Sequence, residues 1–85
     1  MSRMAAVPTV LHERGFKFYF WSNERGEPPH IHARSGDAYA KVWLGPPVMV
    51  AESHDCSPRE IRLVLEVVTA RRAMMEQAWH EHFGT

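Results

Sequence analysis

One short stretch, Glu27–His32, restricts the backbone and presents two histidine side chains together. Its two consecutive prolines fix φ and donate no backbone hydrogen bond, so the segment is stiff and extended. The alternation of histidine with apolar residues that follows has the two-residue period of a strand, which places His30 and His32 on one face of a sheet. We therefore expect a strand from His30, with paired histidines that are either a chemical site or part of the scaffold.

The same two-residue period recurs through the first half of the chain. The expected strands are Val7–Leu11, Phe16–Trp21, His30–Arg34, Ala38–Leu44 and a short Val48–Ala51, which could instead be an apolar connector. Gly15 and Gly36 lie in short polar linkers between alternating runs, which is typical of hairpins. The pattern predicts a small antiparallel sheet of three to five strands in hairpin order.

The last third of the chain predicts a helix. Ser57 is a capping residue, Pro58 suits the first helical position and Glu60 completes a capping box. No glycine or proline then occurs before Gly84. A straight helix of this length is longer than a small sheet can cover. We expect either a break near Thr69–Arg72 or one long helix whose overhanging end exposes apolar side chains to a partner. The side chains of that overhang are Met74, Met75, Trp79 and Phe83.

Together these elements predict an α+β fold, with the helix packed on one face of the sheet. The length of 85 residues suits a single domain, ordered from about residue 7 to 84. No run is long and apolar enough for a transmembrane helix, and the first residues do not resemble a secretory signal, so we expect a cytoplasmic protein. Cys56 is the one cysteine, which excludes a disulfide within the chain.

The paired histidines are compatible with two kinds of chemistry. On one face they could ligate zinc or act as acid and base on a phosphodiester, with Lys41 or Arg34 stabilising the charged intermediate. A zinc site needs a third ligand. The candidates for it are His12, His54, Asp55 and Cys56. The structural alternative is that both histidines hydrogen-bond loop backbone and hold the proline turn in place.

A second set of residues is predicted to share the sheet face with the histidines. If the register holds, this face interleaves bases with aromatic rings, as single-stranded RNA binding or a protein interface requires. Its members besides His30 and His32 are Lys17, Tyr19, Trp21, Tyr39, Lys41 and Trp43. Ten basic and ten acidic residues cancel, which favours a protein partner, or a second copy of the chain, over RNA. On the helix, Trp79 and Phe83 are candidate interface residues, and Arg72 is a candidate anion contact or a stem packed on the core.

Several of these segments together resemble a small prokaryotic family, the domain-of-unknown-function family 4160. The similarity spans Val7 to Gly84, and the Pro-Pro-His-Ile-His run is its most specific part. The other matching segments are Pro8–Val10, Trp21–Glu24, Gly36–Asp37, Ala40–Leu44, Ala78–Trp79 and Phe83–Gly84. The resemblance implies a short cytoplasmic protein encoded beside another small protein, an arrangement similar to toxin–antitoxin pairs.

The leading hypothesis is a protein-interaction component of such a toxin–antitoxin-like pair. The first alternative is a histidine-dependent ribonuclease or other phosphodiesterase that uses His30 and His32. The second alternative is a zinc-binding module built on the same histidines.

Overall fold

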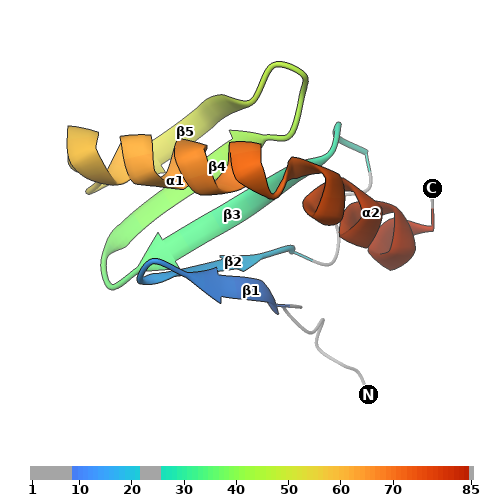
Figure 1. The fold of residues 1–85 in the computed structure, drawn as a ribbon, viewed down its shortest axis with the longest axis horizontal. Coiled ribbons are helices and arrows are strands. Elements are labelled where there is room, and N and C mark those ends of the chain that lie inside the picture. The colour runs from blue at the N-terminus through green and yellow to red at the C-terminus, as the bar shows by residue number, and fades with distance from the viewer. Residues whose placement is uncertain (1–8, 22–25, 85) are drawn as a thin grey trace.

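The structure, a computed structural model, describes residues 9–21 and 26–84 (Figure 1). Five strands precede two helices, and the strands form one antiparallel sheet in the order β1-β2-β3-β4-β5. The elements are β1 Thr9–Glu13, β2 Phe16–Tyr19, β3 His30–Ser35, β4 Ala38–Trp43, β5 Met49–His54, α1 Pro58–Ala70 and α2 Arg72–Phe83. The α+β prediction is confirmed, and all but the first residue of the Val48–Ala51 segment belong to a strand, β5, which continues to His54. Residues 7 and 8 of the expected first strand, and residues 22–25 of the following loop, lie outside the described residues.

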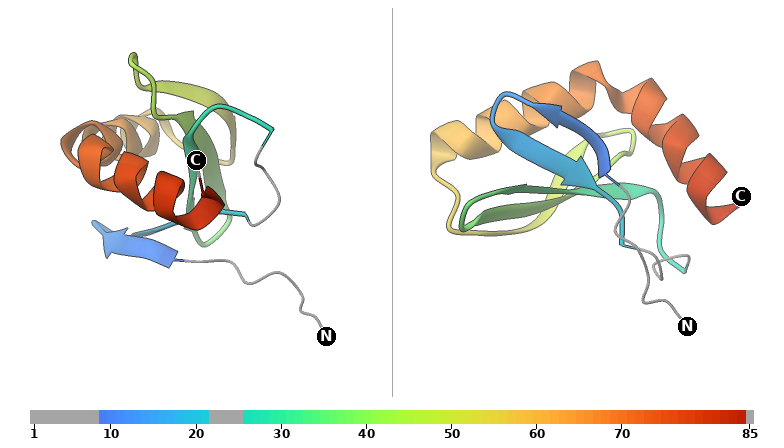
Figure 2. Two further views of the ribbon diagram at one scale, coloured as in Figure 1. Left: turned by 90° about the vertical axis from the view of Figure 1, so that its right-hand side faces the viewer. Right: turned by 90° about the horizontal axis from the view of Figure 1, so that it is seen from below.

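Both helices lie on one side of the sheet (Figure 2, right), and the core lies between the helices and the sheet. In β4 the burial alternates strictly, with Ala38, Ala40 and Val42 buried and the residues between them half-buried. The phenylalanines of β2 and the residues Ile31 and Ala33 face the same side. This alternation is the pattern expected for an antiparallel sheet that is covered by helices on one face.

Each edge strand contains one bulge. The pairing of β1 with β2 shifts between Thr9 and Leu11, and the pairing of β4 with β5 shifts opposite Ala51. In each case the edge strand contains the extra residue, Val10 or Ala51. Bulges interrupt the regular row of free backbone groups and so discourage edge-to-edge association. Both edges of the described sheet are therefore poor templates for the addition of another strand.

The predicted capping box at the start of α1 is confirmed. The Ser57 hydroxyl accepts a hydrogen bond from the Glu60 backbone N–H at 3.1 Å, and the Glu60 carboxylate accepts one from the Ser57 N–H at 2.8 Å. The expectation of one long helix is wrong, and the alternative of a break is correct. The helical segment is interrupted at Arg71, whose φ and ψ are −107° and 14°.

Two arginines fix the position of this break. Arg71 donates from Nε to the Glu13 carboxylate of β1 at 2.9 Å. Arg72 donates to the backbone carbonyls of Leu44 and Gly45 just after β4, both at 2.7 Å. The bend contains no glycine or proline, and side-chain hydrogen bonds to β1 and to the backbone after β4 hold it in place. These arginines do contact polar groups, but the groups belong to the same chain.

The predicted apolar overhang is also wrong. The bend at Arg71 directs α2 past the start of β3 (Figure 2, right), and the inward side of α2 is buried there. Met75 is fully buried and Trp79 is 3% exposed, whereas Met74 is 41% exposed. Trp79 packs against Phe20 and Phe83, with ring centroids 5.6 and 4.1 Å apart. Within the described residues, no helix is long and apolar enough to cross a membrane.

Replacing Trp79 with alanine removes a buried aromatic ring from the contact between α2 and the sheet. We expect the free energy of unfolding to fall by about 3–5 kcal/mol, the usual cost of such a truncation. The matched control is Met74→Ala on the exposed side of the same helix, which should change it by less than about 0.5 kcal/mol. Denaturant unfolding of both variants checks this, and equal losses would contradict the packing described.

Candidate functional site

The side of the sheet away from the helices gathers the residues that the sequence placed together. We call this side the outer face. Its register pairs Tyr19 with His32, His32 with Lys41, and His30 with Trp43. Because directly opposed residues point to the same side, the predicted shared face is confirmed. The outer face consists of Thr9, His12, Lys17, Tyr19, His30, His32, Arg34, Tyr39, Lys41, Trp43, Met49, Glu52 and His54, with Trp21 packed on it.

Four aromatic rings form a ladder across the outer face, one from each of β2 to β5. Tyr19 stacks on His32 with centroids 5.4 Å apart and planes at 22°. His32 stacks on Tyr39 at 5.9 Å and 24°, and Tyr39 stacks on His54 at 5.9 Å and 22°. We call these four residues the ring ladder. Its rings face one another along the sheet, and each such contact adds to the stability gained by burial.

His32 is held in the centre of this ladder. It is 2% exposed, and its Nδ1 lies 2.8 Å from the Tyr39 hydroxyl in a hydrogen bond. The edge of Trp21 contacts both His32 and Tyr19, with centroids 6.0 Å away from each. With His30, the imidazole therefore has four ring neighbours.

His30 lies at the end of the sheet, where α2 passes. It is fully buried, with ring centroids 5.2 Å from His32, 5.3 Å from Trp43 and 4.9 Å from Trp79. Its Nδ1 donates a hydrogen bond to the Pro28 carbonyl at 2.9 Å. The structural interpretation of this histidine, as a clamp on the proline turn, therefore has a direct geometric basis.

Lys41 is directed towards the loop before β3. Its Nζ forms an ion pair with the Glu27 carboxylate at 2.6 Å and lies over the Trp43 ring at 4.8 Å. The same carboxylate is 4.0 Å from His30 Nδ1, which is too long for a hydrogen bond. The lysine predicted to stabilise a charged intermediate is thus already neutralised by a carboxylate.

No group of three or more histidine, cysteine, aspartate or glutamate residues suited to a metal occurs in the described part of the chain. His54 is separated from His32 by the Tyr39 ring. Cys56 donates its thiol to the Tyr39 carbonyl at 3.2 Å, and His12 is exposed on β1. The candidates for a third zinc ligand therefore do not converge on the His30 and His32 pair.

The predicted binding residues divide into two groups. Tyr19, Trp21, Tyr39 and Trp43 belong to the outer face, whereas Arg72, Trp79 and Phe83 belong to the core side of α2. The sequence interpretation considered His54 only as a metal ligand and missed its place in the ring ladder. That place follows from the pairing of Tyr39 with His54, which lies beyond the bulge at Ala51. Alternation alone could not give it, because a bulge changes the register.

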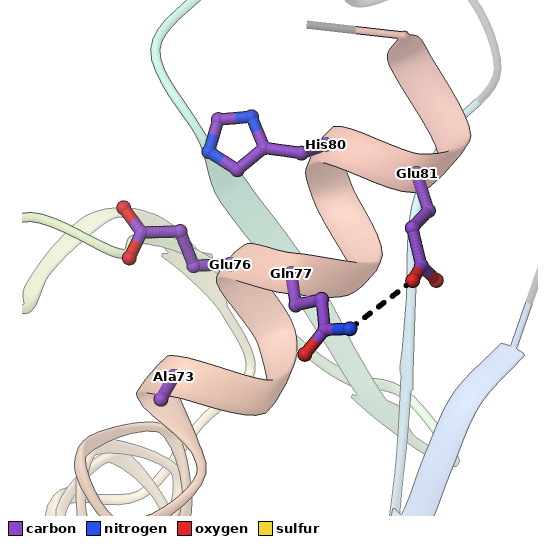
Figure 3. Close-up of a pocket in the computed structure, with 5 residues that line it drawn as sticks. All are labelled: Ala73, Glu76, Gln77, His80 and Glu81. Atoms are coloured by element: carbon purple, nitrogen blue, oxygen red, sulfur yellow. Dashed lines mark hydrogen bonds between the residues drawn. The ribbon is translucent and has the colours of Figure 1, made fainter.

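A shallow hollow on α2 does not provide a second site (Figure 3). All its lining residues come from one helix, and their side chains point in different directions. Gln77 donates to the Glu81 carboxylate at 3.2 Å. The other side chains drawn are Ala73, Glu76 and His80. No set of chemical groups converges there.

Comparison with known proteins gives one match. The family described as "Domain of unknown function (DUF4160)" matches residues 15–80, most of the chain. No curated protein and no solved structure matches. The matched range contains both histidines, the ring ladder and the break between the helices.

The contact of His30 with Pro28 determines where one proton lies. A carbonyl only accepts hydrogen bonds, so His30 Nδ1 must have a hydrogen in this arrangement. We expect nitrogen-15 NMR of the imidazole side chains to show Nδ1 of His30 protonated. His12, exposed on β1, provides the internal reference for an unconstrained ring. A neutral His30 with its hydrogen on Nε2 would contradict the clamp.

Proposed function

This chain belongs to the DUF4160 family, and we propose that it is the protein-interaction component of a two-protein module of the toxin–antitoxin type. The observation that supports this most is the outer face. It is a sheet surface with aromatic and basic side chains, away from the helices. We propose that the partner chain binds this face.

The arrangement of the rings favours a protein partner over RNA. Single-stranded nucleic acids bind by stacking bases on open aromatic faces. In the ring ladder those faces contact one another, and Lys17 lies 5.4 Å from the centroid of the Tyr19 ring. The net charge of zero also lacks the basic excess that phosphate binding usually requires.

The accessible parts of the outer face have the composition of an interface. Trp21 is 43% exposed, Arg34 is exposed, and Tyr39 and Trp43 are half-buried. Tryptophan, tyrosine and arginine are the residues that most often dominate binding energy at protein interfaces. They surround a rigid, buried centre, so little conformational freedom would be lost on binding.

The ribonuclease alternative is supported by the proximity of the two imidazoles and by the hydrogen bond of His32. Their centroids are 5.2 Å apart, and the Tyr39 hydroxyl orients His32 as a third group orients a catalytic base. Burial argues against it, because His30 is fully buried and His32 is 2% exposed. An acid and a base must reach the substrate within hydrogen-bond distance. Catalysis would therefore require the outer face to open.

The interaction proposal is tested by co-expressing this protein with the product of the adjacent gene and purifying one through a tag on the other. We expect a stable complex. Trp21→Ala should raise its dissociation constant by about tenfold or more, the effect of losing an aromatic anchor. Met74→Ala, an exposed apolar residue on the helix side, is the matched control and should leave binding unchanged. If this protein does not co-purify with the adjacent-gene product, the proposal is wrong.

The enzymatic alternative is tested by inducing the protein in a bacterium and examining growth and RNA integrity. We expect intact RNA with the wild type, because the buried histidines do not reach substrate. His32→Gln is the comparison, since glutamine is polar but cannot exchange protons near neutral pH. Cleaved RNA with the wild type and intact RNA with His32→Gln would establish catalysis by this histidine. That result would contradict a purely interacting role.

A further inference from the structure

On the outer face, two positively charged side chains lie directly opposite each other on neighbouring strands. Lys17 of β2 and Arg34 of β3 are direct partners in the sheet register. Side chains in such a pair extend side by side, and like charges directly opposite each other destabilise a sheet. Neither cation forms an ion pair in the described part of the chain. Each instead lies over a tyrosine ring, Lys17 over Tyr19 at 5.4 Å and Arg34 over Tyr39 at 5.1 Å.

The two cations border a surface hollow. It has a volume of about 240 Å³ and is lined by Lys17, Tyr19, Trp21 and Arg34. The other outer-face lysine, Lys41, is neutralised by Glu27. The uncompensated positive charge of this face is therefore concentrated at the hollow, beside its most exposed aromatic ring.

We propose that this hollow, which we call the cation pair site, binds a carboxylate of an acidic segment of the partner protein. The inference rests on the proposed function and names the chemistry of the partner. A carboxylate between the two side chains would turn a repulsive pair into two charge-assisted hydrogen bonds. The guanidinium of Arg34 matches a carboxylate in shape, and Trp21 provides an apolar surface for the residue next to the acid. The partner's binding segment is thus acidic with adjacent apolar side chains.

A protein carboxylate explains the site better than an RNA phosphate. Base stacking would accompany phosphate contacts, and the inner rings of the ladder, His32 and Tyr39, are covered on both faces by their neighbours. Among the described residues, the unpaired positive charge of the outer face is also confined to this one hollow. Two cations suit one or two acidic side chains rather than a continuous phosphate backbone.

The test uses a fluorescein-labelled oligoglutamate peptide as the probe, with oligolysine and oligouridylate for comparison. Fluorescence anisotropy measures affinity at low salt. Amide and indole NMR shifts locate the binding. We expect oligoglutamate to bind and to shift the signals of Lys17, Trp21 and Arg34. Tighter binding of oligouridylate at the same residues would overturn the proposal in favour of nucleic acid.

Two variants with equal charge change make the test specific. Lys17→Gln/Arg34→Gln should weaken oligoglutamate binding by about tenfold or more. Arg59→Gln/Arg62→Gln removes two exposed cations of α1 and should leave it unchanged. Equal losses in both would show that the peptide senses only net charge, which would refute the site. The charge-reversed Lys17→Glu/Arg34→Glu protein should bind oligolysine instead.

Stability gives an independent readout. Lys17→Glu creates an opposite-charge pair with Arg34, so its thermal midpoint should rise while oligoglutamate binding is lost. If Lys17 had only a structural role, Lys17→Glu would lower both the thermal midpoint and oligoglutamate binding. The adjacent-gene product separates the two proposals. If it binds the wild type and Lys17→Gln/Arg34→Gln equally well, the cation pair site is wrong but the interaction proposal stands. If the adjacent-gene product does not bind the wild type at all while oligoglutamate does, the interaction proposal is wrong but the cation pair site stands as a carboxylate-binding site.

Discussion

The fold depends on the fact that one pair of helices can cover only one face of a five-stranded sheet. The side facing α1 and α2 is satisfied by an ordinary apolar core. The other side has no second layer among the described elements, so its large side chains must bury one another. The ring ladder, with Trp21 and His30 packed beside it, contributes to the burial of Tyr19 and His32, which are almost fully buried on this face. A small chain thereby gains a second, thinner core from side chains that stand close together on neighbouring strands.

The sequence predicted this arrangement as far as local patterns extend. Alternation located the five strands and their two faces, although β1 and β5 extend further along the chain than it predicted, and the capping box at Ser57 located the start of α1. The features it left open or missed depend on contacts between distant segments. The bend at Arg71 is held by Glu13 and by carbonyls after β4, and neither partner can be identified from the helix itself. The expected overhang failed for the same reason, because the bend brings Trp79 back onto His30. His54 was missed because one bulged residue changes the register of β5.

On the outer face, most side chains have partners within the chain that stabilise the fold, whereas two cations are left available for binding. The rings of the ladder, the ion pair of Lys41 with Glu27 and the clamp on Pro28 all satisfy groups within the chain. Lys17 and Arg34 lie over tyrosine rings but oppose each other directly, and no carboxylate in the described residues pairs with either of them. Violations of local rules in an otherwise consistent structure tend to occur where function requires them. This distinction separates the cation pair site from the rest of the face, which is explained by packing.

The same reasoning changes how the histidine pair is interpreted. Two aligned histidines after a rigid turn suggest catalysis or metal binding when only the sequence is known. In the structure each imidazole meets two structural requirements at once. It provides a flat ring that fits between aromatic neighbours, and it provides a polar nitrogen for Pro28 or for the Tyr39 hydroxyl. Phenylalanine would fill the space but lose the hydrogen bond, and asparagine would keep a hydrogen bond but lose the ring. The Pro-Pro-His-Ile-His run is therefore explained by the need to join a stiff turn to the aromatic outer face, and its presence is not in itself an argument for an enzyme.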